Sequence, residues 1–287
     1  LWRGLPEMSI IQPASGIVDW DRIWQLQGDL TEANGGPSLA IYANDGTAVP
    51  TGLKFCSPIL GTESIRFKVY SEFNPSSASS RGHYLAVTDP TLAYAGAMTI
   101  SFLVMSTSYS EGCLFRYGIE PTAHTWADQG DNDLYSIRLH AQNNYNKGIF
   151  FSWMPTASAS PYGRMCTPSL DEAQPILVQT VRSGDAVPTI TICFNGMVVV
   201  KTTKQWYPRS FPPDTATWLN NLALPIGGDD AACSFHIGEC FNGCIWSVAL
   251  VNRVLTGTET AVVGDTATGE IAELYAATLQ PFFGARR

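Results

Sequence analysis

Residues Leu222–Leu255 read LALPIGGDDAACSFHIGECFNGCIWSVALVNRVL, and this stretch predicts two short strands followed by the start of a helix. From Gly243 onward the side chains alternate between two expected faces, with Cys244, Trp246, Val248 and Leu250 on one face and Ile245, Ser247 and Ala249 on the other. A period of two is typical of a strand whose faces have different surroundings. Thr256 and Glu259 then have the spacing of a capping box, in which each side chain binds the other residue's backbone amide.

Short strands and turns account for most of the remaining chain. Further strands are expected over residues 39–42, 64–70, 84–87, 98–105, 114–117, 135–140, 148–154, 176–181, 189–194 and 197–201. The last two flank Asn195-Gly196, which favours a type I′ hairpin turn because both turn positions need positive φ. The sequence therefore predicts an all-β fold: a two-sheet antiparallel jelly-roll sandwich with a short C-terminal helix and an extended N-terminal arm.

Several motifs carry a resemblance to a known family. They are Ile226-Gly227-Gly228, Phe241-Asn242-Gly243-Cys244-Ile245, Val251-Asn252-Arg253-Val254-Leu255-Thr256 and Glu270-Ile271-Ala272-Glu273-Leu274-Tyr275. In this order they resemble the C-terminal signature of laminin-G-like domains in the concanavalin A-like lectin/glucanase superfamily. The segments 84–87 and 98–101 resemble the opening of the same family, so the likeness spans Gly82–Tyr275. Residues Thr260–Gly269 depart from it, because they separate pieces that the family usually keeps contiguous.

The first sixty residues are expected to be distinct from the rest. Pro, Gly and Ser punctuate the segment Ile11–Asp21, and Trp20 and Trp24 are large apolar groups in a polar neighbourhood. We predict an N-terminal arm with leading strands over residues 1–60 and a laminin-G-like jelly roll over 61–287. Trp20 and Trp24 either dock on a partner subunit or cover the sandwich of their own chain. In the first case, a chain without Leu1–Leu30 should still fold.

Charge and cysteine content exclude some classes of partner. The formal net charge is −8 with 17 Lys and Arg, which argues against nucleic-acid binding because phosphates need a basic surface. No apolar run is long enough to insert into a membrane. Seven cysteines leave at least one thiol free in a monomer, and Cys193 and Cys244 fit core positions of strands. We expect mostly reduced, buried thiols, and we rank strand and turn positions above a zinc site for Cys233, His236, Cys240 and Cys244.

The sequence does not indicate an enzyme. Glycoside hydrolysis needs two carboxylates flanking the scissile bond, and related glucanases carry them on one strand as E-x-D-x-x-E or E-x-D-x-E. This chain has no such run, and its acidic residues fall between the expected strands. We therefore nominate no catalytic residue and expect no cofactor. Calcium is an alternative at Asp128, Asp131 and Asp133, whose carboxylates are hard ligands, although a solvated acidic loop is the preferred interpretation.

Two aromatic or amide-rich segments are candidates for carbohydrate binding. A sugar packs its C–H face on an aromatic ring while amide or carboxylate groups bind its hydroxyls. Gln205–Trp218 and Ala141–Lys147 have this composition, and the candidate ligand-binding residues are Trp206, Tyr207, Trp218, Tyr145 and Asn144. The alternative is that these rings cover sandwich edges or form subunit contacts, where Trp and Tyr are also enriched.

The resemblance implies a function as well as a fold. The Pro-rich start with Asp19-Trp20 is similar to the leader of laminin-G-like proteins of tailed bacteriophages, and Leu274–Phe283 is similar to their ends, with Ala277-Thr278-Leu279 in place of Asn-Pro-Trp. We predict a non-catalytic structural or adhesion component of a bacteriophage virion: a tail, fibre or capsid-surface protein. Its expected partners are other virion proteins, copies of itself and host-surface carbohydrate. A cellular lectin-like module is the alternative, and a glycoside hydrolase is less favoured.

Overall fold

A computed structural model describes most of the predicted strands and the helix. The described residues are 18–42, 48–51, 53–56, 64–67, 83–88, 97–106, 112–119, 135–140, 148–153, 163–166, 175–185, 189–202, 233–237 and 243–266.

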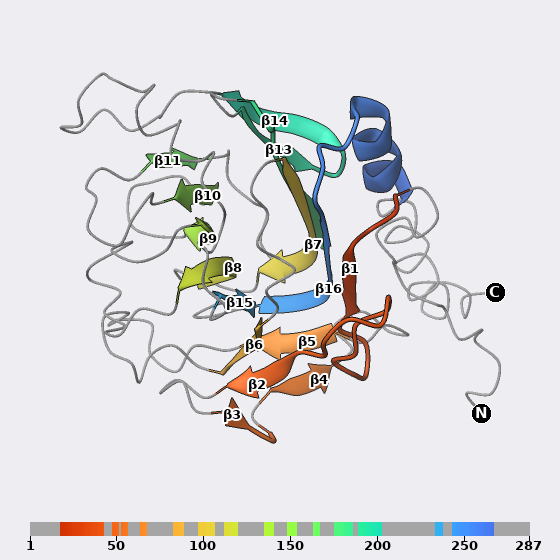
Figure 1. The fold of residues 1–287 in the computed structure, drawn as a ribbon, viewed down its shortest axis with the longest axis vertical. Helices are drawn as coiled ribbons and strands as arrows, with labels where there is room; N and C mark the ends of the chain where they lie inside the picture. Colours follow the sequence, from red (N-terminus) through yellow and green to blue (C-terminus); the bar gives the residue numbers. More distant parts are fainter. Residues whose placement is uncertain are drawn as a thin grey trace, which may run out of the picture.

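Two antiparallel sheets face each other, as predicted (Figure 1). The first sheet runs in the order β14 (Met197–Thr202), β13 (Ile190–Phe194), β12 (Ile176–Arg182), β7 (Met98–Ser106), β16 (Gly243–Val251), β5 (Ser64–Phe67) and β4 (Lys54–Cys56), with β1 (Arg22–Gln25) also pairing with β16. The second runs β11 (Gly163–Cys166), β10 (Gly148–Trp153), β9 (Tyr135–His140), β8 (Gly112–Ile119), β15 (Cys233–Ile237), β6 (Tyr84–Thr88), β2 (Ala40–Tyr42) and β3 (Ala48–Val49). A helix, residues 257–266, follows β16. The all-β sandwich with a short C-terminal helix is confirmed.

The main core lies between the sheets and is built from alternate residues of each strand. From β7 it contains Ile100, Phe102 and Val104, and from β6 it contains Leu85 and Val87. This is the pattern expected when one face of each sheet packs against the other sheet.

A second apolar cluster covers the outer face of the first sheet. It joins Leu103 and Leu177 of the sheet to Leu255 and to Val263 of the helix. Figure 1 shows the helix on the side of the first sheet that faces away from the second. β16 is therefore covered on both faces, and all nine of its residues are buried.

The strict alternation predicted for β16 is wrong because a β-bulge interrupts it. Ile245 pairs with Val104 and Ser247 with Leu103, so Trp246 is an extra residue in the ladder. Such an insertion shifts the side chains that follow it to the other face. Cys244, Trp246 and Ala249 consequently belong to the outer cluster, whereas Ile245, Val248 and Leu250 belong to the main core. The bulge lies where the other edge of β16 changes its partner from β5 to β1.

The described part of the first sixty residues is built into both sheets. β1 and β4 belong to the first sheet, and β2 and β3 to the second. Residues 18–56 thus supply strands to both sheets. The predicted boundary at residue 60 separates strands that belong to the same sheet. Among the described residues, no helix is long and apolar enough to cross a bilayer.

The Asn195-Gly196 hairpin turn is confirmed. Asn195 and Gly196 have φ values of 49° and 80° and connect β13 to β14. Cys193 and Cys244 are buried thiols that form no disulfide, also as predicted. Burial raises the pKa of the Cys193 thiol to about 11, which keeps it protonated and unreactive.

Candidate functional site

All the residues predicted to bind carbohydrate or calcium lie outside the described residues. They are Asn144, Tyr145, Trp206, Tyr207, Trp218, Asp128, Asp131 and Asp133. The strands that flank their segments are described, however. The ends of these strands show at which end of the sandwich each segment is attached.

At one end of the second sheet lie strand residues that flank two of these segments, 120–134 and 203–232. Tyr117 near the end of β8 pairs with Tyr135 at the start of β9, and Ile119 pairs with Cys233 at the start of β15. We call this the Cys233 end. The segment 120–134, with the three aspartates, therefore starts and returns at the Cys233 end.

The first sheet contributes the strand that leads into the aromatic segment. Arg182, which ends β12, pairs with Met98 and Ile190, and Ile190 pairs with Thr202 at the end of β14. β6 ends at Thr88, opposite Ser234 of β15, and the segment 89–97 connects it to β7. This connection indicates that Met98, and therefore Thr202, lie at the Cys233 end.

Connections at the opposite end support this orientation. Residues 107–111 join β7 to β8, and residues 238–242 join β15 to β16. Five residues reach at most about 20 Å, which is less than the length of about 30 Å of a nine-residue strand such as β7 or β16. Each connection must therefore stay at one end, which we call the Gly243 end.

The predicted ligand residues are thus divided between the two ends. The segment 203–232, with Trp206, Tyr207 and Trp218, leaves β14 and enters β15 at the Cys233 end. The segment 141–147, with Asn144 and Tyr145, joins His140 to Gly148, which pair with each other at the Gly243 end. The topology brings the anchors of the acidic and aromatic segments together and places those of Asn144 and Tyr145 opposite them.

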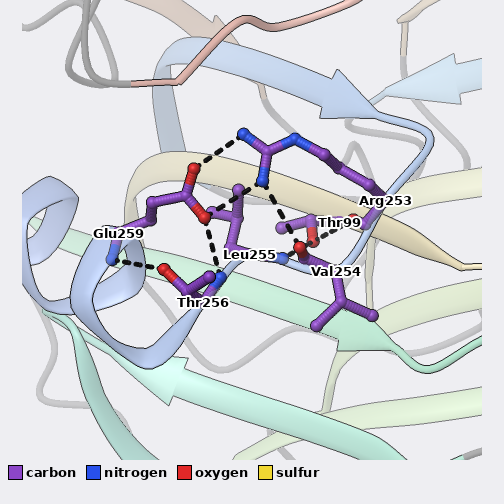
Figure 2. A network of polar contacts seen from close by, with 6 residues as sticks. All are labelled: Thr99, Arg253, Val254, Leu255, Thr256 and Glu259. Atoms are coloured by element: carbon purple, nitrogen blue, oxygen red, sulfur yellow. Dashed lines mark hydrogen bonds and ion pairs between the residues drawn. The ribbon is translucent and has the colours of Figure 1, made fainter.

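A polar network at the Cys233 end fixes the start of the helix (Figure 2). The Glu259 carboxylate accepts hydrogen bonds from both terminal nitrogens of Arg253, at 2.7 and 3.0 Å, and from the Thr256 backbone N–H at 2.8 Å. The Glu259 N–H donates to the Thr256 hydroxyl at 3.1 Å, which completes the predicted capping box. Thr99 of β7 joins the network, since its hydroxyl donates to the Arg253 carbonyl oxygen and accepts from the Leu255 N–H.

The charges in this network stabilise each other. The hydrogen bonds from Arg253, followed by that from the Thr256 backbone, lower the pKa of Glu259 to about 2, and Glu259 in turn raises the pKa of Arg253. Asp21 accepts a hydrogen bond from the Asn252 backbone N–H at 2.7 Å. Glu259 and Asp21 thus hold the start of the helix against the sheet.

Trp20 and Trp24 pack into the sandwich of their own chain. Trp24 is 0% exposed in the main core, and its indole N–H donates to the Pro37 carbonyl oxygen at 3.2 Å. Trp20 is 3% exposed and belongs to the outer cluster. Of the two alternatives derived from the sequence, covering their own sandwich is the one that the structure displays. Neither ring presents a face to a partner in this conformation.

Sequence reasoning missed Glu32, which organises the loop after β1. Its buried carboxylate accepts hydrogen bonds from the backbone N–H groups of Ile23 at 2.7 Å, Asn34 at 2.9 Å and Gly36 at 2.5 Å. The only signal was the turn sequence that follows it, since a side chain that binds distant backbone amides leaves no pattern of its own. The role of Glu32 is therefore structural: its carboxylate holds the loop after β1 in place.

Metal ligands do not cluster in the described part of the chain. There, no group of three or more His, Cys, Asp or Glu side chains is arranged to hold an ion. The predicted calcium ligands lie outside it.

Comparison with known proteins shows the fold. No family model and no curated protein matches the chain. Solved structures do match, including botulinum neurotoxin type C, described as depending on interaction with two ganglioside molecules to enter cells, with 11% identity and a TM-score of 0.52. The binding domain of botulinum neurotoxin DC, solved in complex with rat synaptotagmin II, matches with 10% identity and a TM-score of 0.52. Domain 4 of an arabinanase from Geobacillus stearothermophilus, in complex with arabinotriose, has 13% identity, a TM-score of 0.49, and coverage of 85% of this chain and 100% of its own.

The neurotoxin matches cover 86% of this chain but only 50 and 51% of their own chains. This chain thus spans about half the length of those structures. The likeness extends to the fold alone. It establishes a β-sandwich of the kind that these binding domains contain.

Proposed function

We propose that this chain is a non-catalytic binding domain of a bacteriophage particle that holds a host-surface carbohydrate at its Cys233 end. The observation that carries the carbohydrate proposal is that Thr202 and Cys233, the flanks of the segment with Trp206, Tyr207 and Trp218, lie at the same end of the sandwich. The sheets thereby provide a rigid base for an aromatic segment whose residue types suit a sugar. The neurotoxin structures support the proposal, since a domain with this fold occurs in proteins that interact with gangliosides.

Two observations support the proposal that the chain belongs to a bacteriophage particle. The Pro-rich start with Asp19-Trp20 and the end Leu274–Phe283 resemble those of phage laminin-G-like proteins, and the motifs over Gly82–Tyr275 resemble the laminin-G-like family. Cys193 and Cys244 are buried and form no disulfide, which suits a protein that folds in a reducing host cytoplasm before the particle is released.

A glycan array with three variants tests the binding site. We expect Trp206→Ala and Trp218→Ala to weaken binding at least tenfold with little change in Tm, because each substitution removes a ring on which the C–H face of the sugar would pack. Tyr145→Ala, at the Gly243 end, is the matched aromatic control and should retain binding. Loss on Tyr145→Ala alone would move the site to the Gly243 end, and the absence of any bound glycan would contradict the proposal.

A protein contact is the second candidate function. The neurotoxin DC binding domain was solved with a protein, synaptotagmin II, so this fold also occurs in domains that bind proteins. In a virion, such contacts would be made with copies of the same chain or with other particle proteins.

The molar mass of the purified chain, measured by light scattering at two concentrations, tests the assembly. A closed oligomer that persists on dilution supports the virion component, since homo-oligomers are usually closed and symmetric. A monomer at both concentrations would instead favour the alternative of a cellular lectin-like module.

Calcium is a subsidiary proposal at the same end. Asp128, Asp131 and Asp133 belong to a segment whose flanks, Ile119 and Tyr135, lie beside Cys233. Calorimetric titration of the chain with calcium should give heat that Asp131→Asn reduces. Equal traces with and without the substitution would leave the aspartates as a solvated acidic segment.

A further inference from the structure

Two buried polar side chains are neighbours on the outer face of the first sheet. Ser101 of β7 and Gln179 of β12 are cross-strand neighbours, and both are 0% exposed. Neither the Ser101 hydroxyl nor either atom of the Gln179 amide has a hydrogen-bond partner within the part of the chain that the structure describes.

Most neighbours of this pair on the sheet are apolar, although Thr99, two positions before Ser101 on β7, is also buried on this face and uses its hydroxyl to bind the backbone of Arg253 and Leu255. Residues two positions away on the same strands, Leu103 and Leu177, belong to the cluster that includes Val263 of the helix. Ala249 lies opposite Ser101 on β16, and Cys193 lies opposite Gln179 on β13. A methyl group offers no hydrogen bond and a protonated thiol only a weak one. The pair therefore forms a small buried polar site whose neighbours on the sheet are mostly apolar.

Such a pair is costly unless something binds to it. Nearly all buried polar side-chain atoms in native proteins have a partner in the protein or in ordered water. The Gln179 amide offers an acceptor oxygen and two N–H donors, and the Ser101 hydroxyl can donate or accept. A ligand for both must itself donate and accept, and the neutrality of the two groups gives no preference for an ion.

We propose that Ser101 and Gln179 form a binding site for ordered water, buried between the outer face of the first sheet and the groups that cover it. One or two water molecules bridge the hydroxyl and the amide. The site is thus part of the cluster that attaches the helix to the sheet, and it is independent of the proposed glycan site.

Thr180 is a useful control because it is the next residue on β12 but faces the main core. Its hydroxyl is also buried without a partner in the described residues, and its cross-strand neighbours are Ile100 and Ile192. Those neighbours are apolar, so a water there would lack the several polar partners that a buried water needs.

A crystal structure of the full chain, at a resolution that shows ordered water, tests the site directly. The expected result is density within hydrogen-bonding distance of the Ser101 hydroxyl and of the Gln179 amide. A direct hydrogen bond between the two side chains, or partners supplied by other protein groups, with no water density would overturn the proposal.

Thermal unfolding gives a second readout. We expect Gln179→Leu to lower Tm, because it removes the amide that binds the water and leaves the water with fewer hydrogen-bond partners. Thr180→Val should leave Tm unchanged or raise it. A rise in Tm on Gln179→Leu would mean that the amide was unsatisfied, and it would also overturn the water site.

Discussion

At the scale of single residues, the motif Asn252-Arg253-Val254-Leu255-Thr256 has a structural explanation for most of its letters. Arg253 binds the capping glutamate, Leu255 is buried in the outer cluster, and Thr256 caps the helix. The Asn252 backbone binds Asp21. This motif, one of several that carry the family resemblance, therefore joins a strand to a helix. The motif therefore indicates the fold and does not indicate a ligand-binding site.

The capping glutamate predicts acid sensitivity. The pKa of Glu259 is about 2 in the folded chain, below its usual 4.5, so its contribution to stability is complete above pH 4.5 and is lost as the pH falls toward 2. Because the Arg253 side chain is 40% exposed, solvent screening limits this contribution to about 1 kcal/mol. Urea unfolding at several pH values should show this loss in the wild type.

Glu259→Gln is the matched variant for that measurement. Glutamine can still fill the third position of a capping box, but it cannot titrate or form the ion pair. The variant should be less stable at pH 7 and should approach the wild type near pH 2. An unchanged difference between the two proteins across this range would show that the ion pair contributes nothing.

Glu32 makes a second prediction at this scale. Glu32→Gln replaces one acceptor oxygen by an N–H group that would face backbone donors, so we expect the free energy of unfolding to fall by about 1–3 kcal/mol. Asp29→Asn is the control, since Asp29 is exposed and accepts from the Thr31 N–H with an oxygen that asparagine retains. Equal stabilities of the two variants in urea would argue against a central role for Glu32.

At the scale of elements, the helix and the β13–β14 hairpin approach each other through glycines. A Cβ atom on Gly264 would lie 2.2 Å from the Gly196 backbone nitrogen and 2.3 Å from the Asn195 carbonyl carbon. Asn195 is fixed in turn, because its side-chain oxygen accepts from the Leu177 N–H and its own N–H donates to the Leu177 carbonyl. The helix therefore rests on a hairpin turn that cannot move aside easily.

Substitution of Gly264 tests this contact. Gly264→Ala should destabilise the protein by about 1–3 kcal/mol or more, because the added methyl overlaps backbone atoms rather than a flexible side chain. Gly257→Ala, in the same helix, is the control, since nothing lies within 4 Å of its added Cβ. Comparable Tm values for Gly264→Ala and the wild type would contradict the close packing.

At the scale of the whole molecule, the N-terminal region is part of the sandwich. β1 pairs with β16, and Trp20 and Trp24 fill the outer cluster and the main core. We therefore expect deletion of Leu1–Leu30 to abolish folding, because it removes a strand and two buried indoles, each worth about 3–5 kcal/mol when truncated. Near-ultraviolet circular dichroism measures this directly. A truncated chain with a native spectrum and a cooperative transition would restore the model of a separable arm.

The sequence by itself determined the fold class, most strand positions, the Asn195-Gly196 turn and the capping box. These features are local, since they depend on alternation or on residues within four positions of one another. It also identified Cys193 and Cys244 as core residues.

Only the tertiary structure decided where distant groups meet. The bulge at Trp246 coincides with a change of partner strand, and the role of Glu32 depends on backbone amides nine residues before it and up to four after it. The sequence could not decide whether Trp20 and Trp24 dock on a partner or cover their own sandwich, because their burial depends on β16, more than two hundred residues away. Likewise, Thr202 and Cys233 lie at one end of the sandwich through strand pairing over long separations, and local sequence carries no record of such pairing.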